Sequence, residues 1–497
     1  MPKPFSKVRS AAIDGRALNP IFRKLQLRRL HDLLSDKAAE IQDALTGDVG
    51  DSPVRAAEAQ LEYWLAMRVL SQEWAALDTG KALHDEYAVS RGQNSLGREP
   101  VGIVVIHPAR HAFLFALMSA LAPALAAGNC VIVHTEQTLQ RTPRLVLDLV
   151  AQALDDEIFA VADSPPSDSE IGHPHVRVLQ NGSADGSSNI VPSHHLVSDS
   201  DVRVAAVVER DADLDLAARE LVRARFGFRG SPPPYAPDVV LVNEWVKPKF
   251  MEAVVRHTVR FSSPETKGKR PSPVPGPGQS LSEKLKGEKG LNVVSWSSTG
   301  IVVDVEDRQS SILRSKVHEN CLLVHATTSI DDAIDVANRN GRLGAAYIFA
   351  KLAPAKYICQ FLGTPLSFVN HCPTSLLFWP MTPQTLAGDL SNFSPYGQDV
   401  FSLPKTQIVA PSAQETSLAK ALQLDPPGCG LGAALALEAA AKLPALERPY
   451  PGIRGLHFFM QGILTGGILL LSPVLTAVGV GSYYGIALFK AGVFHNS

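Results

Sequence analysis

The sequence predicts an α/β fold built on parallel sheets, followed by one long apolar helix. Three observations lead to this prediction. Residues 101–106 (Val-Gly-Ile-Val-Val-Ile) form a run typical of a strand buried on both faces of a parallel sheet. A helical segment over residues 113–127 and a second apolar run over residues 130–133 complete a strand–helix–strand unit, the building block of doubly wound nucleotide-binding domains. Residues 455–489 contain no Asp, Glu, Lys or Arg.

Length and composition indicate a globular chain of several domains. A chain of 497 residues predicts roughly two to four domains. With 45% hydrophobic and 19% charged residues, wholesale disorder is excluded. Lys and Arg number 47 against 49 Asp and Glu, which leaves no electrostatic footprint for nucleic acid. The 5 cysteines lack metal-type spacing, and no apolar signal segment follows Met1, so we expect a reducing, cytosol-facing compartment.

Helical periodicity dominates the first hundred residues, and strand-like runs dominate later. Apolar residues recur at helical spacing over residues 22–45 and 56–77, and residues 142–154 are also predicted to be helical. Strand-like runs occur at residues 204–208, 239–242, 300–303 and 321–324, with helical segments such as 331–337 between them. Residues 163–175 and 262–290 are rich in Pro, Ser and charged residues, and we expect loops there, the second an exposed insertion.

The charge-free stretch is long enough to cross a membrane. An α-helix needs about 20 apolar residues to span the hydrocarbon, and residues 461–480 supply them. Membrane helices tolerate Pro473 and the neighbouring glycines better than soluble helices do. A buried core helix is one alternative, and a hairpin kinked at Pro473 that enters and leaves one leaflet is another.

The flanking charges predict the orientation of this span. Lys442, Arg448 and Arg454 precede it, and only Lys490 follows it. By the positive-inside rule the preceding part of the chain stays in the cytosol. We therefore expect a single-pass tail anchor over residues 455–490, with the endoplasmic reticulum as the expected membrane.

A series of short motifs occurs in a fixed order between residues 5 and 410. They read Glu-Pro-Val-Gly-Ile-Val (99–104), Ala-Ala-Gly-Asn-Cys-Val-Ile (126–132), Asp-Ala-Asp-Leu-Asp-Leu-Ala-Ala (211–218), Ala-Pro-Asp (236–238), Ser-Ile-Asp-Asp-Ala-Ile (329–334) and Tyr-Gly followed by Phe-Ser (396–402). In this order they resemble the aldehyde dehydrogenase superfamily. With its apolar tail the chain is most similar to the class 3, membrane-anchored fatty aldehyde dehydrogenases.

The resemblance implies a Rossmann-type cofactor domain, a catalytic α/β domain and an arm that pairs subunits. We expect these at residues 1–203, 204–390 and 391–425, with a linker or amphipathic helix at 426–454 and the anchor at 455–490. The segment 399–409 resembles the arm strand, so the resemblance implies a homodimer. The other expected partners of the chain are the membrane and an apolar small molecule.

In this superfamily a Cys thiolate attacks the aldehyde, and hydride passes to NAD or NADP. A Glu activates the water that hydrolyses the thioester, and an Asn with a backbone N–H stabilises the oxyanion. In this chain the nucleophile position before Ala-Pro-Asp is Pro234, in the run Ser-Pro-Pro-Pro-Tyr, and proline supplies neither a thiol nor a backbone donor. Arg110 stands at the position of the oxyanion Asn, and Asp199 at that of the general-base Glu.

The positions that the resemblance assigns to the cofactor are also changed. His134 stands where the family has the ribose-binding Lys, and Lys316 where it has the first Glu of the Glu-x-Phe-Gly-Pro clamp. Gly182 and Ser183 match the family Gly-Ser at a helix start that faces the pyrophosphate. Gly182 is alternatively a simple turn residue. If the chain holds a cofactor, the resemblance implies NAD or NADP.

Cys372 is the one alternative nucleophile that the sequence offers. It lies where the family strand runs toward the substrate tunnel, next to His371. Neighbours in a strand point to opposite faces, so His371 is poorly placed to activate this thiol. A buried, inert cysteine is the commoner outcome.

Three functions remain open from the sequence. The first is a catalytically degenerate, membrane-anchored homologue that acts through binding or partners. The second is an active NAD(P)-dependent oxidoreductase for a long-chain or apolar aldehyde. The third is an enzyme of different chemistry in the same pocket, such as an ancillary step on a lipid-like metabolite. The simultaneous loss of four parts of one mechanism favours the first.

A gene-reading error between Arg229 and Tyr235 would remove the Cys, but it would not change Arg110, His134 or Lys316.

Overall fold

The computed structural model of the chain forms two units, Met1–Ile408 (unit 1) and Val409–Ser497 (unit 2), which are described separately. The structure describes residues 4–49, 53–87, 97–136, 138–182, 195–228, 230–261, 290–296, 300–383, 386, 394–405, 412–422, 429–443 and 458–493.

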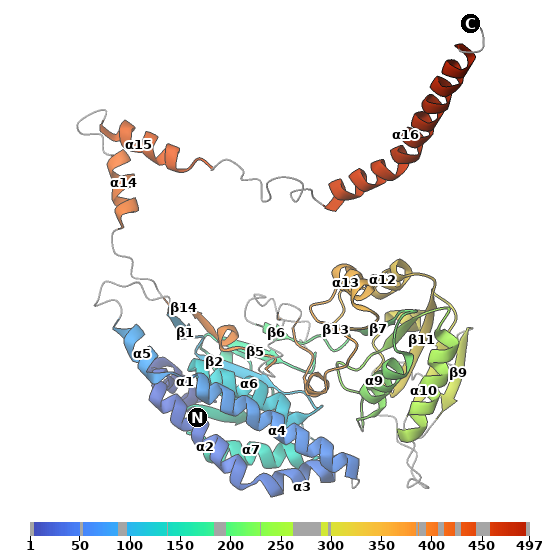
Figure 1. Cartoon of the computed structure of the whole chain (residues 1–497). Coiled ribbons are helices and arrows are strands. Elements are labelled where there is room, and N and C mark those ends of the chain that lie inside the picture. Colours follow the sequence, from blue (N-terminus) through green and yellow to red (C-terminus); the bar gives the residue numbers. More distant parts are fainter. Residues whose placement is uncertain are drawn as a thin grey trace. The chain divides into compact units, whose positions relative to one another are not determined.

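Unit 1 contains a five-stranded parallel sheet near its amino end (Figure 1). Its strands lie in the order β4 (Phe159–Ala162), β3 (Cys130–His134), β2 (Ile103–His107), β5 (His175–Leu179) and β6 (His195–Val197). The predicted strand–helix–strand unit is confirmed as β2, α6 (Phe113–Ala127) and β3. Residues 103–106 are buried on both faces of the sheet, which explains their continuous apolar run.

Helices surround this sheet. They are α1 (Ser6–Asp14), α2 (Pro20–Asp36), α3 (Ala38–Val49), α4 (Pro53–Ala76), α5 (Thr79–Glu86) and α7 (Arg141–Ala153), with a short 3₁₀ turn at Arg16–Leu18. The sequence sets the start of α2, because the Asn19 side chain accepts the N–H groups of Ile21 and Phe22 and Pro20 occupies the first turn. Helix α4 packs on the buried helix α6, and α3 packs on α7.

A seven-stranded sheet forms the rest of unit 1. Its strands lie in the order β13 (Ser367–Val369), β12 (Ala345–Phe349), β7 (Val204–Val208), β8 (Val239–Asn243), β11 (Cys321–Thr327), β10 (Ile301–Val305) and β9 (Leu291–Trp296). All neighbours pair in parallel except β9, which runs antiparallel to β10. The four strands predicted from residues 204 to 324 are confirmed as β7, β8, β10 and β11.

Each face of this sheet contributes to a different core. Ala206 and Val208 join a core with the helices α9 (Leu214–Phe226) and α10 (Lys247–Phe261). Ala205 and Val207 point the other way, into a core with α12 (Ile330–Asn338) and α13 (Leu352–Phe361). The central strands are therefore apolar at successive positions.

Short elements complete unit 1. β1 (Arg98–Pro100) pairs antiparallel with β14 (Ser402–Pro404), so part of the predicted arm segment pairs within its own chain. The loop predicted at residues 163–175 contains a one-turn helix, α8 (Asp168–Ile171), which Ser167 and Glu170 close with a capping box. Most of the predicted insertion, residues 262–289, lies outside the described part of the chain. Short 3₁₀ helices occupy Ser311–Arg314, Ser375–Phe378 and Gln398–Phe401.

Unit 2 consists of helices in its described part. They are α14 (Ala413–Leu422), α15 (Cys429–Ala440) and α16 (Phe458–Val493). Within α16, residues Met460–Lys490 have a mean hydropathy of 2.1 in their most apolar window, and 0% of that window is buried. By length and composition this helix can cross a membrane. It continues through Pro473 as one helix, unlike the hairpin considered as an alternative. Its exposed window also differs from a buried core helix, the other alternative.

Candidate active site

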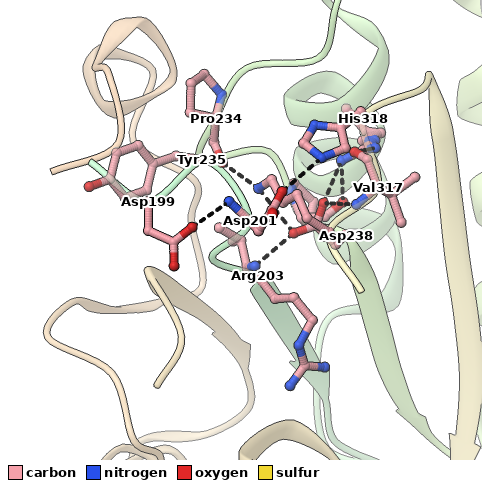
Figure 2. Close-up of polar contacts among 12 residues, drawn as sticks. Asp199, Asp201, Arg203, Pro234, Tyr235, Asp238, Val317 and His318 are labelled. Atoms are coloured by element: carbon pink, nitrogen blue, oxygen red, sulfur yellow. Dashed lines mark hydrogen bonds and ion pairs between the residues drawn. The ribbon is translucent and has the colours of Figure 1, made fainter. Parts of the chain in front are cut away.

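The candidate active site lies at the amino ends of three neighbouring strands. The segments 199–203, 231–238 and 316–320 precede β7, β8 and β11. These strands are parallel neighbours in the sheet, so their amino ends meet at one edge. The structure thereby brings together Asp199, Pro234 and Lys316, as Figure 2 shows for the polar contacts around Pro234 and Asp238.

The backbone around Pro234 is held by its neighbours. The Pro234 carbonyl accepts a hydrogen bond from Lys316 Nζ at 2.6 Å. The adjacent Tyr235 is fully buried, and its hydroxyl lies 2.8 Å from Thr382 Oγ1. The Tyr235 carbonyl in turn accepts the Tyr347 hydroxyl at 2.8 Å. The turn at Pro234, where the resemblance places the nucleophile, is therefore held by hydrogen bonds on both sides.

Asp238 is the centre of a buried charge cluster beneath this turn. Its Oδ2 lies 3.0 Å from Lys316 Nζ and accepts the Val204 N–H at 2.7 Å. Its Oδ1 lies 3.1 Å from Arg225 Nη1 and accepts the Val317 N–H at 3.2 Å. The side chains of Arg225 and Asp238 are 0% and 1% exposed. We call Arg225, Asp238 and Lys316 the charge cluster.

Lys316 is enclosed within this cluster. Its side chain is 6% exposed. Burial lowers the pKa of its ammonium, and the nearby Asp238 opposes that effect. Lys316 thus donates hydrogen bonds to groups of its own chain.

Arginines and an asparagine join the two loops that border the site. Arg225 donates to the carbonyls of Val317 and Glu319, both at 2.6 Å. Asn320 Nδ2 donates to the Gly230 carbonyl at 3.1 Å. Nearby, the buried Arg203 donates to the carbonyls of Leu313 and Ala337. The segments before β8 and β11 are therefore connected by Arg225, which contacts Asp238 in one and two carbonyls in the other, and by Asn320.

Asp199 lies at the exposed side of this edge. Its Oδ1 accepts the N–H of Asp201 at 2.9 Å, a local turn within one loop. Asp201 in turn lies 3.3 Å from Nε2 of the exposed His318. The Asp199 carboxylate is thus exposed and accepts a hydrogen bond within its own loop.

Of the predicted cofactor residues, His134 and Gly182 lie at the carboxyl ends of β3 and β5 in the five-stranded sheet, whereas Lys316 lies in the charge cluster. His134, which is 8% exposed, places Nδ1 at 3.1 Å from Nδ1 of His107. Burial lowers the pKa of both imidazoles, that of His107 to about 4, so the pair is neutral at neutral pH. Arg110 forms an exposed ion pair with Glu136.

Gly182 is explained by its packing. It adopts φ 77, and a Cβ at this position would lie 2.7 Å from Ser200 Oγ. The glycine is therefore required by the close approach of the loop after β6. Ser183 lies outside the described residues.

Cys372 is 2% exposed, and burial raises the pKa of its thiol. Arg223 donates to the Cys372 carbonyl at 2.7 Å, while the adjacent His371 bonds to the Val369 carbonyl. Among the described contacts, none links an imidazole to this thiol.

The sequence motifs do not indicate the charged residues that organise this edge. Asp238 is the last residue of the Ala-Pro-Asp motif, and no motif contains Arg203 or Arg225. A signal was present, because Asp238 directly precedes the apolar run of β8 and Arg225 lies in the last turn of an apolar helix face. A charge in such a position needs a buried partner.

Comparison with known proteins identifies the class. The model of the aldehyde dehydrogenase family matches residues 6–279, more than half of the chain, and the chain belongs to that family. It is distantly related to family 3 members. "Aldehyde dehydrogenase family 3 member B1" of Rattus norvegicus is 23% identical over 69% of this chain and 77% of the relative. "Aldehyde dehydrogenase, dimeric NADP-preferring" of Canis lupus familiaris is 21% identical over 69% and 79%.

Solved structures show the same fold. The substrate-bound state of AldH from Staphylococcus aureus superimposes with a TM-score of 0.64 and 16% sequence identity, covering 88% of this chain and 98% of that one. The α/β architecture with a cofactor-type and a catalytic-type sheet is therefore confirmed. At this identity the likeness concerns the fold alone.

Proposed function

We propose that this chain is a membrane-anchored aldehyde dehydrogenase homologue that has lost the thiol-based oxidation of aldehydes and acts as a binding or partner protein. The dehydrogenase fold serves it as a scaffold. The proposal concerns the chemistry of one edge of the seven-stranded sheet and the role of α16.

One observation carries the proposal, namely the contact of Lys316 with both Pro234 and Asp238. The ammonium lies 2.6 Å from the Pro234 carbonyl and 3.0 Å from Asp238 Oδ2. A thiohemiacetal needs a thiol at this turn and backbone donors for the oxyanion, and a proline offers neither. The lysine moreover directs a positive charge to the place where the resemblance expects the carboxylate of the clamp.

The residues at the cofactor positions do not fit NAD or NADP. His134 uses its Nδ1 toward His107, Lys316 is enclosed in the charge cluster, and the space beside Gly182 is filled by Ser200. The three described residues that the resemblance assigns to the dinucleotide are thus in contact with other residues of the chain. We therefore assign no redox step to this protein.

The anchor and the dimer complete the proposal. Tyr483 and Tyr484 lie in the last third of α16, and tyrosines are typical of the interface between a membrane and water. We propose that α16 anchors unit 1 to the cytosolic face of the endoplasmic reticulum. The homodimer remains a prediction from the family arm, and light scattering of the purified chain in detergent tests it.

An activity assay tests the loss of chemistry. The purified chain should form no NADH or NADPH above background with octanal, a longer fatty aldehyde or benzaldehyde, and calorimetry should detect no heat of NAD or NADP binding. Removing one member of a catalytic set costs several orders of magnitude in rate, and here the oxyanion donor is missing as well.

Two variants make the assay decisive. Pro234→Cys should regain little activity, because Lys316, His134 and Arg110 still leave the oxyanion and the cofactor without their donors. Cys372→Ala controls for a substitute thiol. Robust turnover in the parent chain that survives Cys372→Ala would show that the protein is an active oxidoreductase and overturn the proposal.

A further inference from the structure

The helix pair of unit 2 exposes leucines that the described chain does not cover. On α14, Leu418 and Leu422 are 44% and 81% exposed, and their spacing of four residues places them on one face. On α15, Leu435 is 56% exposed, and Leu443 just beyond the helix is 92% exposed. The two helices pack against each other, so these leucines remain exposed after that packing.

Helix α15 has almost no polar face. Its sequence, Cys-Gly-Leu-Gly-Ala-Ala-Leu-Ala-Leu-Glu-Ala-Ala, contains Glu438 as its single charged residue. A helix that is apolar on all sides is normally buried in a core or in a membrane. Yet residues 434–436 are exposed in the described structure. With 12 residues it is too short to span a bilayer, and its length is typical of an interfacial segment.

The position of α15 in the sequence points to the covering surface. Residues 441–457 separate it from α16 and reach at most about 60 Å when fully extended. If α16 crosses a membrane, α15 can never be farther than this from the lipid. Such tethering gives effective concentrations in the millimolar range, so weak apolar attraction is enough for α15 to associate with the membrane.

We propose that α14 and α15 lie in the interface of the membrane that α16 crosses, with their leucines among the lipid acyl chains. This inference rests on the proposed anchor. The helix pair α14–α15 is then a second membrane-bound element, which lies along the bilayer. The lipid covers its leucines, which would otherwise be exposed to water.

Fluorescence in vesicles tests the inference on the full chain. In a background with Cys359→Ser and Cys429→Ser, a single environment-sensitive dye is attached at Leu435→Cys. Cys130, Cys321 and Cys372 are buried and stay unlabelled in the folded protein. The chain is reconstituted in phosphatidylcholine vesicles that carry spin-labelled lipids, either near the glycerol or near the end of the acyl chain.

Two control positions separate the possible outcomes. Leu475→Cys reports on the middle of α16, and Leu139→Cys, which is fully exposed in unit 1, reports on water. We expect position 435 to lose most of its fluorescence to the shallow quencher, position 475 to the deep one and position 139 to neither. Leu422→Glu should weaken the shallow quenching at 435.

The possible failures are distinguishable. If position 475 is quenched and position 435 behaves like position 139, the interfacial role of α15 is wrong while the anchor stands. If position 475 is not quenched, the anchor itself is wrong. A dye at 435 that is shielded from water but not quenched by lipid would mean that protein covers the helix, and this result also overturns the inference.

Discussion

The charge cluster of unit 1 and the helix α16 depart from the usual distribution of residues in opposite ways. Arg225, Asp238 and Lys316 are charged but buried, and the described chain supplies their partners. Helix α16 is apolar but exposed over its most apolar window, and the described chain supplies nothing to cover it. The first region finds its counter-charges within the chain, whereas the second requires a surface from outside. The first therefore concerns stability, and the second concerns location.

The largest expected effect comes from removing α16, the helix that needs a surface from outside the chain. Deleting the residues from Gly455 onward should move the protein from the membrane fraction into the soluble fraction after a carbonate wash. α16 is the described helix that is long and apolar enough to span, while α14 and α15 lie at the interface, where such a wash removes them. Cell fractionation with immunoblotting measures this, and a full-length chain that washes off would refute the anchor.

A change inside the charge cluster comes next. Asp238→Asn leaves Arg225 and Lys316 buried without their counter-charge, which should lower the free energy of unfolding by about 3–5 kcal/mol. Denaturant titration followed by tryptophan fluorescence measures the loss. The matched control is Asp201→Asn, because Asp201 is exposed and forms its ion pair with the exposed His318. Its cost should stay within about 0.5 kcal/mol, and equal effects of the two variants would contradict a structural role for the cluster.

The same contrast explains how much of the fold could be predicted from the sequence. Strands buried on both faces leave continuous β-branched runs, so β2, β3, β7, β8, β10 and β11 were found within a few residues. β12 was missed because its run, Ala-Ala-Tyr-Ile-Phe, is equally compatible with a buried helix segment. The edge strand β9 was missed because exposed positions interrupt its pattern. Helix α8 was missed because a single turn depends on the local capping box of Ser167 and Glu170.

The candidate site was predictable only in part. The family motifs located Pro234 and Lys316, because each lies at a fixed distance from a recognisable neighbour. Their direct bond was not predictable, since it joins positions 82 residues apart and depends on β8 and β11 being adjacent. The role of Asp238 was not predictable for the same reason, because its partners Arg225 and Lys316 are distant in the sequence and only the fold brings them near.

The smallest expected effect concerns a buried group that stays neutral instead of charged. The pKa of His107 falls from 6.5 to about 4 in the folded chain, mainly because burial penalises the imidazolium. Between these values the unfolded chain binds a proton that the folded chain does not, so stability decreases as the pH falls from about 6.5 to about 4. Near pH 4 the decrease in the free energy of unfolding that His107 causes should approach about 3 kcal/mol, since one pKa unit corresponds to roughly 1.4 kcal/mol. His107→Gln should make that slope smaller, as measured by denaturant titrations at several pH values, while His134, whose pKa burial also lowers, keeps its own contribution. Parent and His107→Gln curves that run parallel from pH 7 to pH 4 would mean that burial does not hold His107 neutral in the folded chain.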